Sequence, residues 1–208
     1  MTHIEIPLNF TDSYFQLKSI YSEIEKQIME KEGRINIENY QFNNYIGDIT
    51  KNINWTWAIN QKSIQLFMYI LEQFQEDINN FFENKFNLIG ASFITLFEKE
   101  VKDTDFHYDI NSHYDNEKCN TITLIFPLYI EEDMGNLEYK ENAETKIYEY
   151  QKNKVLVWDA CKFEHRTQPY ILSEKKKRVL VSMNLSTEEE WAEKSVVNSL
   201  QYQGNIIL

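Results

Sequence analysis

The spacing of apolar residues divides the chain into a helical first part and a strand-rich second part. Over residues 14–32, apolar side chains recur mainly at three- and four-residue intervals, and Gly33 follows as a natural helix stop. Residues 61–86 repeat this pattern. We therefore expect amphipathic helices to dominate residues 1–90, with an aromatic and irregular segment over residues 40–60.

After residue 88 the pattern changes to short runs rich in β-branched and aromatic residues, which are typical of strands. The predicted strands are residues 91–97, 106–110, 121–130, 137–140, 146–151, 155–158 and 178–185. Such a series, with turn residues between its members, favours a sandwich or a barrel. Ser186 and Glu189 have the spacing of a capping box, which predicts a short helix from residue 187.

The length and composition favour one domain in a reducing compartment. The chain has 208 residues, of which 42% are hydrophobic, and no linker rich in Pro, Gly or Ser interrupts it. Its N-terminus lacks the basic start and apolar stretch of a signal peptide, and no apolar run is long enough to span a bilayer. Cys119 and Cys161 are too few for a disulfide framework. We expect a single domain over residues 1–208 and a cytoplasmic location.

The net charge argues against a nucleic-acid partner. It is −12, and binding to a phosphate backbone depends on basic groups that neutralise it. The basic run at residues 175–178 is expected to form a solvated turn before a strand, although its last member, Arg178, is a separate case.

Two His-x-Asp triplets, His107 to Asp109 and His113 to Asp115, are candidates for a metal site. In an extended strand, residues i and i+2 point to the same face, so each triplet would present an imidazole and a carboxylate to one ion. His165 is available as a third ligand. Two imidazoles and one carboxylate, with the remaining positions open, are associated with non-haem Fe(II) oxygenases.

The local sequence favours the first triplet over the second. Phe106 precedes His107 in strand-like sequence, whereas His113 follows Asn111 and Ser112, which are typical of a loop. His113 and Asp115 remain the alternative ligand pair. If His107 and Asp109 bind the metal, His113 and Asp115 would either line the mouth of the pocket or be solvated surface residues.

Three further side chains are candidates for contact with a substrate. Trp55 and Trp57 lie in the irregular segment and are candidate walls of a pocket, the alternative being that they are ordinary core aromatics. Arg166, beside His165, is either a surface charge or a substrate contact.

The order of these features resembles a known family. His107-x-Asp109, Gly135 to Tyr139, Val155 to Asp159, His165-Arg166-x-x-Pro169 and Arg178 together resemble the C-terminal part of a 2-oxoglutarate- and Fe(II)-dependent dioxygenase of the prolyl-hydroxylase-like kind. The resemblance covers residues 88–185, and the N-terminal part carries no motif that matches.

The resemblance implies a mainly β fold, a double-stranded β-helix (a jelly-roll or cupin-like barrel) backed by N-terminal helices. Residues 1–90 would be mostly helical support, 91–185 the jelly-roll core and 186–208 a C-terminal extension. His107, Asp109 and His165 would bind Fe(II), the cosubstrates would be 2-oxoglutarate and O2, and Arg178 would bind the distal carboxylate of 2-oxoglutarate through its bidentate guanidinium. Thr121 or Thr123 would add a hydrogen bond to the same carboxylate.

These expectations lead to a prediction of function with two alternatives. The protein would hydroxylate an unactivated C–H bond of a small molecule, such as an amino acid or a natural-product intermediate, and release succinate and CO2. Asp109 favours hydroxylation over halogenation, because the halogenases that the resemblance brings in lack this carboxylate. The net negative charge of the chain would suit a cationic substrate. The alternatives are a peptidyl hydroxylase and a non-catalytic, cupin-like metal-binding protein.

Overall fold

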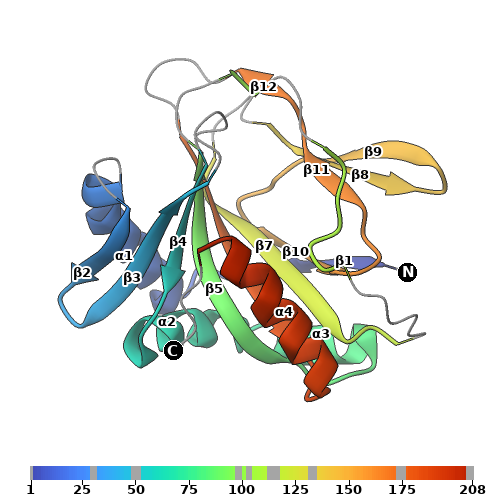
Figure 1. The fold of residues 1–208 in the computed structure, drawn as a ribbon, viewed down its shortest axis with the longest axis horizontal. Coiled ribbons are helices and arrows are strands. Elements are labelled where there is room, and N and C mark those ends of the chain that lie inside the picture. Colours follow the sequence, from blue (N-terminus) through green and yellow to red (C-terminus); the bar gives the residue numbers. More distant parts are fainter. Residues whose placement is uncertain are drawn as a thin grey trace.

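The computed structural model describes residues 2–28, 32–47, 53–96, 100–101, 105–111, 118–130, 135–171 and 177–204. Most of its strands form one antiparallel eight-stranded sheet (Figure 1). In spatial order these strands are β1 (His3–Pro7), β10 (Lys154–Asp159), β7 (Thr121–Tyr129), β13 (Arg178–Ser186), β5 (Asn87–Leu96), β4 (Ile53–Ala58), β3 (Tyr40–Ile46) and β2 (Gly33–Ile37).

Two smaller sheets complete the β structure. The first contains β11 (His165–Thr167), β8 (Leu137–Glu141) and β9 (Glu144–Tyr148), and the second pairs β12 (Tyr170–Ile171) with β6 (Glu100–Val101). A cluster of buried side chains joins the large sheet to the three-stranded one, with Leu156 and Leu180 on one side and Leu137 and Tyr148 on the other. The predicted jelly-roll arrangement of two facing sheets is therefore present.

Helices cover the opposite face of the large sheet. They are α1 (Asp12–Ile28), α2 (Gln61–Leu71) and α3 (Gln75–Phe82), and their buried apolar residues join one core cluster with the sheet. A fourth helix, α4 (Glu190–Tyr202), crosses the other face, beside the three-stranded sheet (Figure 1). The large sheet is thus covered on both sides, which explains why β7 and β13 consist almost entirely of buried residues.

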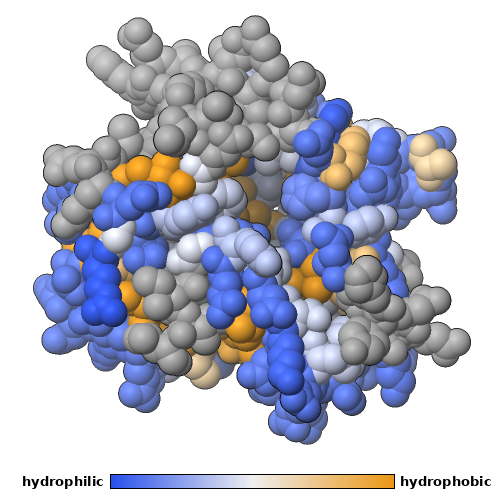
Figure 2. Space-filling model, viewed as in Figure 1, coloured by the Kyte–Doolittle hydropathy of each residue, from blue (hydrophilic) through white to orange (hydrophobic). Residues whose placement is uncertain are grey.

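The alternation of side chains along β13 separates the core from a cavity. Val179, Val181, Met183 and Leu185 point into the helix-covered core. The intervening residues, Arg178, Leu180, Ser182 and Asn184, line a cavity of about 420 Å³ on the other face. Figure 2 shows a hollow near the middle of this side of the molecule, with apolar side chains in its wall.

The predicted strands 121–130 and 178–185 are confirmed almost to the residue, but four other predictions are wrong. The irregular segment 40–60 contains β3 and β4, and with β1 and β2 the first 90 residues hold more sheet than expected. The helix predicted over 61–86 is divided by a turn into α2 and α3. The strand predicted over 106–110 is a single bridge at His107. The last helix begins at Glu190, after an N-cap residue whose side chain makes no capping hydrogen bond.

We expect Phe93→Ala to lower the free energy of unfolding by about 3–5 kcal/mol, because it removes a fully buried ring and leaves a cavity. The ring centroid of Phe93 lies 5.1 Å from that of Tyr21 and 5.3 Å from that of Phe67. Urea unfolding would measure the change. Phe15→Ala is the matched control, because this phenylalanine is 56% exposed, and its loss should change stability by about 0.5 kcal/mol or less. Similar losses in both variants would contradict the packing described.

Candidate metal centre

His107 and His165 are brought together by an antiparallel backbone bridge. The amide of His107 donates to the carbonyl of His165 at 2.9 Å, and the amide of His165 donates to the carbonyl of His107 at 3.0 Å. A hydrogen-bonded pair of this kind places the two side chains on the same face. The imidazole centroids are 4.6 Å apart.

In both histidines, a hydrogen bond from the ring to the backbone carbonyl two residues earlier fixes the tautomer of the imidazole. Nδ1 of His107 lies 3.0 Å from the carbonyl oxygen of Asp105, and Nδ1 of His165 lies 3.0 Å from that of Phe163. A carbonyl oxygen only accepts, so each Nδ1 carries the proton and donates. Each Nε2 therefore keeps its lone pair, which is the arrangement found in metal-binding histidines.

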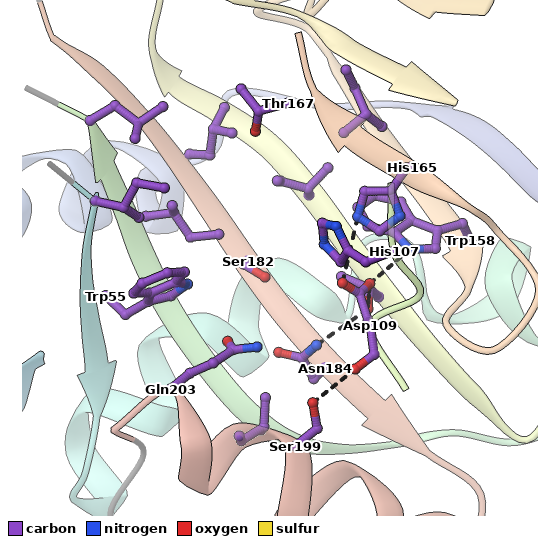
Figure 3. Close-up of a pocket in the computed structure, with 18 of the residues that line it drawn as sticks. Trp55, His107, Asp109, Trp158, His165, Thr167, Ser182, Asn184, Ser199 and Gln203 are labelled. Atoms are coloured by element: carbon purple, nitrogen blue, oxygen red, sulfur yellow. Dashed lines mark hydrogen bonds and ion pairs between the residues drawn. The ribbon is translucent and has the colours of Figure 1, made fainter. Parts of the chain in front are cut away.

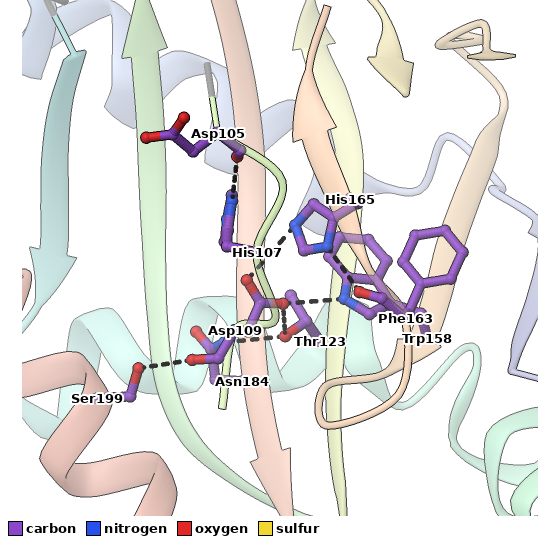
Figure 4. Close-up of polar contacts among 9 residues, drawn as sticks. All are labelled: Asp105, His107, Asp109, Thr123, Trp158, Phe163, His165, Asn184 and Ser199. Carbon is purple, nitrogen blue, oxygen red and sulfur yellow. Dashed lines mark hydrogen bonds and ion pairs between the residues drawn. The ribbon is translucent and has the colours of Figure 1, made fainter. Parts of the chain in front are cut away.

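Asp109 completes the cluster, with its two carboxylate oxygens in different surroundings (Figure 4). Its Oδ2 accepts hydrogen bonds from Thr123 Oγ1 at 2.6 Å and from Trp158 Nε1 at 2.9 Å. Its Oδ1 lies 3.5 Å from Nε2 of His165. One potential ligand atom from each of His107, Asp109 and His165 lies within 4.8 Å of the others. The donor set fits a divalent cation of the Fe(II) type.

Burial keeps His165 in the neutral form that binds metals. Desolvation lowers the pKa of His165, the nearby Asp109 carboxylate raises it, and His107 lowers it. The His165 ring packs edge-on against Trp158, with centroids 5.1 Å apart, and is stacked on Phe163 at 5.6 Å. A neutral imidazole loses no proton when it coordinates an ion.

Arg178 lies in the same cavity, at the other end of the row of lining residues on β13. Its side chain is 2% exposed, it donates to the carbonyl of Gly135, and its guanidinium carbon lies 5.4 Å from the ring centroid of Tyr150 and 5.7 Å from that of Tyr170. Burial lowers the pKa of Arg178, while the two tyrosines raise it. An arginine nevertheless stays protonated in a protein, so this end of the cavity carries a positive charge.

The structure does not support the predicted role of Thr121 and Thr123. Thr123 is paired with Asn184, six residues from Arg178 along β13, which corresponds to roughly 20 Å. Its hydroxyl binds Asp109 instead. Thr121 Oγ1 lies 3.2 Å from Cys161 Sγ. The prediction that either threonine shares a carboxylate with Arg178 is therefore wrong, because both lie toward the far end of β7.

The three candidate substrate contacts have different outcomes. Trp55 lines the cavity (Figure 3). Trp57 lies on the same face of β4 as Trp55, but the end of α4 covers it. The Trp57 Nε1 donates to the carbonyl of Gln203, just after this helix, at 2.7 Å. Arg166 is not among the described residues that line the cavity. Strand alternation turns it away from His165, and it forms a 2.6 Å ion pair with Glu138. Of the two interpretations offered for each residue, the structure supports a core aromatic for Trp57 and an ion-paired charge outside the described cavity for Arg166.

The alternative ligand pair, His113 and Asp115, lies outside the described residues. Sequence reasoning missed Tyr150, Asn184, Ser199 and Gln203, all of which line the cavity. Alternation from Arg178 along β13 would have identified Asn184. Tyr150 follows a strand end, and Ser199 and Gln203 belong to the end of the chain, so no local pattern links them to the metal centre.

Comparison with known proteins shows the fold. No family model and no curated protein matches the sequence. Among solved structures, the chain is similar to HygX from Streptomyces hygroscopicus with nickel and 2-oxoglutarate bound (TM-score 0.57, 10% identity, 90% of this chain and 84% of that one). It is also similar to a Pseudomonas putida prolyl-4-hydroxylase (0.58, 11%, 90% and 93%).

A third similar structure is a Trichoplax adhaerens prolyl hydroxylase in complex with a peptide fragment (TM-score 0.61, 10% identity, 95% of this chain and 87% of that one). These similarities extend over about nine tenths of the chain and so include the N-terminal part, where the sequence offered no motif. The chain has the fold of the 2-oxoglutarate- and Fe(II)-dependent oxygenases.

Proposed function

We propose that the protein is a 2-oxoglutarate- and Fe(II)-dependent oxygenase, with His107, Asp109 and His165 as the metal ligands. The observation that carries this proposal is the convergence of two imidazoles and one carboxylate, with one potential ligand atom of each within 4.8 Å of the others, in the cavity that also holds Arg178. Three ligands leave room for cosubstrate and dioxygen. Bound there with 2-oxoglutarate and O2, Fe(II) would supply the oxidation of an unactivated C–H bond, with release of succinate and CO2.

The chain's own residues would hold the ligands in place before any ion arrives. The two backbone carbonyls fix the imidazole tautomers, and Thr123 and Trp158 engage one oxygen of Asp109. The other oxygen, Oδ1, is directed toward the imidazoles. Partners that orient metal ligands in this way affect metal affinity strongly.

Arg178 would bind the distal carboxylate of 2-oxoglutarate. A carboxylate bound here would form a charge-assisted, bidentate pair with the guanidinium and would offset the cost of its burial. Tyr150 lines the cavity beside Arg178. Burial raises the pKa of Tyr150, and the charge of Arg178 lowers it by a smaller amount. The Tyr170 hydroxyl has no hydrogen-bond partner among the described residues. Tyr150 is thus the tyrosine that lies in the cavity near the expected position of the carboxylate, whereas Tyr170 packs behind Arg178 and is not among the described lining residues.

A small molecule is the substrate class that the cavity supports best. Its volume of about 420 Å³ is near the lower end of the range for small-molecule sites, and α4 covers one side of it. Among the structural neighbours, HygX is known with hygromycin B bound, and the Trichoplax enzyme with a peptide. A peptidyl substrate is therefore the rival, and it would need an open groove. A non-catalytic protein would bind the metal without 2-oxoglutarate.

We expect an anaerobic metal-to-ligand charge-transfer band when Fe(II) and then 2-oxoglutarate are added to the wild-type protein. The band should be absent in His107→Ala, which lacks one ligand. In Arg178→Ala the concentration of 2-oxoglutarate required should rise by an amount equivalent to about 2–5 kcal/mol of binding free energy. Arg178→Lys should recover only part of this, because an ammonium lacks the guanidinium fork. A titration followed by visible absorbance measures each effect.

Arg166→Ala is the matched arginine control, because Arg166 pairs with Glu138 and does not line the described cavity. It should leave the affinity for 2-oxoglutarate unchanged. His113→Ala tests the other triplet and should retain the band. Loss of the band in His113→Ala but not in His107→Ala would move the site to His113 and Asp115. Normal 2-oxoglutarate affinity in Arg178→Ala would refute the role of that arginine.

Thr123→Val should weaken metal binding by roughly 10–100-fold, because it removes the 2.6 Å hydrogen bond that orients Asp109. Thr123→Ser keeps the hydroxyl and should bind metal nearly as well as the wild type. Titration with Co(II), followed by its visible absorbance, measures the affinity without turnover. Equal affinities in the two variants would show that the hydroxyl does not position the carboxylate.

A further inference from the structure

The cavity continues beyond the metal centre toward α4. Figure 3 shows Trp55 and Gln203 on the opposite side of Ser182 and Asn184 from the histidines. Ser199 and Leu200 of α4 complete this part of the lining, and Gln203 directly follows that helix. We refer to the region lined by Trp55, Ser182, Asn184, Leu200 and Gln203 as the α4 half of the cavity.

A chain of hydrogen bonds fixes the orientation of the Asn184 amide. The Thr123 hydroxyl has one proton, and it donates that proton to the Asp109 carboxylate, which can only accept. The Thr123 oxygen must therefore accept from Asn184, whose Nδ2 lies 3.3 Å away. Asn184 Oδ1 is then left on the other side of the amide, as an acceptor facing the cavity (Figure 3).

The floor of the α4 half is polar although it is buried. Asn184 is 7% exposed and Ser182 is 6% exposed. Within the described part of the chain, neither the Asn184 Oδ1 atom nor the Ser182 hydroxyl has a hydrogen-bond partner. Both residues line the cavity, so a ligand or water in it can reach these atoms and form hydrogen bonds with them. These two atoms therefore favour a ligand that offers hydrogen-bond donors.

The charges of the cavity favour a cation. Among the described lining residues, Asp105 and Asp109 are negative and Arg178 is positive, which leaves one net negative charge. A divalent metal ion and the doubly negative 2-oxoglutarate would cancel each other and leave this sum unchanged. Asp105 lines the cavity but is exposed to solvent, and Figure 4 shows its carboxylate on the far side of His107 from Asn184. Trp55 adds an aromatic face, which attracts cations.

We propose that the α4 half of the cavity binds the protonated amine of a small-molecule substrate. Asn184 Oδ1 accepts a hydrogen bond from the ammonium group, and the carbon skeleton packs on Trp55 and Leu200. The net negative charge of the cavity lining, to which Asp105 contributes from outside this half, favours the cation. This inference rests on the proposed oxygenase function for the identity of the bound molecule as a substrate. The preference for amines itself follows from the lining alone.

Matched pairs of six-membered probes test this preference. Cyclohexylamine and piperidine are protonated at neutral pH, whereas cyclohexanol and tetrahydropyran have nearly the same shape without a charge. Affinities are measured by ligand-observed NMR titration, with the protein as purified and again with Zn(II) and 2-oxoglutarate bound. We expect the amines to bind about tenfold more tightly or better than their neutral partners, as one charge-assisted hydrogen bond would provide.

Asn184→Leu should remove most of this preference and Asp105→Asn part of it, and both variants should leave the binding of tetrahydropyran, which has no hydrogen-bond donor, unchanged. Asn184→Gln keeps an uncharged amide with both a donor and an acceptor and should retain more of the preference than Asn184→Leu, which separates loss of the acceptor from damage to the fold. Asp12→Asn is the charge-matched control, because Asp12 is exposed on α1, on the other face of the sheet. It tests whether the net charge of −12 alone attracts amines.

Two results would overturn the proposal. The first is equal binding of amines and their neutral partners to the wild type. The second is a preference that Asn184→Leu does not reduce, or that Asp12→Asn reduces as strongly as Asp105→Asn does. Absence of the Fe(II) and 2-oxoglutarate charge-transfer band would instead refute the oxygenase function. The amine preference would then still be measurable in the protein as purified.

Discussion

The backbone bridge between His107 and His165 is the contact on which the metal centre depends. Within the described residues 105–111, His107 forms the one bridge, and two hydrogen bonds of 2.9 and 3.0 Å attach it to β11. The bridge places the two residues directly opposite each other, so their imidazoles lie on the same face. The carbonyls of Asp105 and Phe163 then orient both rings in the same way. The backbone pairing thus sets the positions of the two ligands, and one carbonyl beside each histidine sets its tautomer.

The third ligand is tied to three separate parts of the fold. Thr123 of β7 and Trp158 of β10 bind the Asp109 carboxylate, while Ser199 of α4 donates to its backbone carbonyl at 2.8 Å. The carboxylate therefore responds to any shift of the large sheet against α4. Because α4 also lines the proposed substrate half of the cavity, substrate binding and metal geometry share the same support.

The sequence allowed prediction of those elements whose local residue pattern is compatible with only one kind of surroundings. The β-branched runs of β7 and β13 can only be strands buried on both faces, and His-x-Asp, His165 and Arg178 stand out as chemistry-bearing residues. The strands β3 and β4 escaped prediction because their polar residues Asn43, Asn44 and Asn54 are buried by tertiary hydrogen bonds. The surroundings of Trp57 and Arg166 could not be predicted, because the packing of α4 on Trp57 and the pairing of β11 with β8 join segments that are far apart in the sequence.

The cavity face of β13 carries polar side chains although the whole strand is buried. Arg178, Ser182 and Asn184 all point to this face. Apolar residues at these positions would pack the two sheets together at lower cost. A sheet that retains a cation at one end and an acceptor at the other is instead divided into two polar compartments. The cation suits an anionic cosubstrate, and the acceptor suits a donor-bearing substrate. The metal ligands lie where a molecule held in either compartment can reach them.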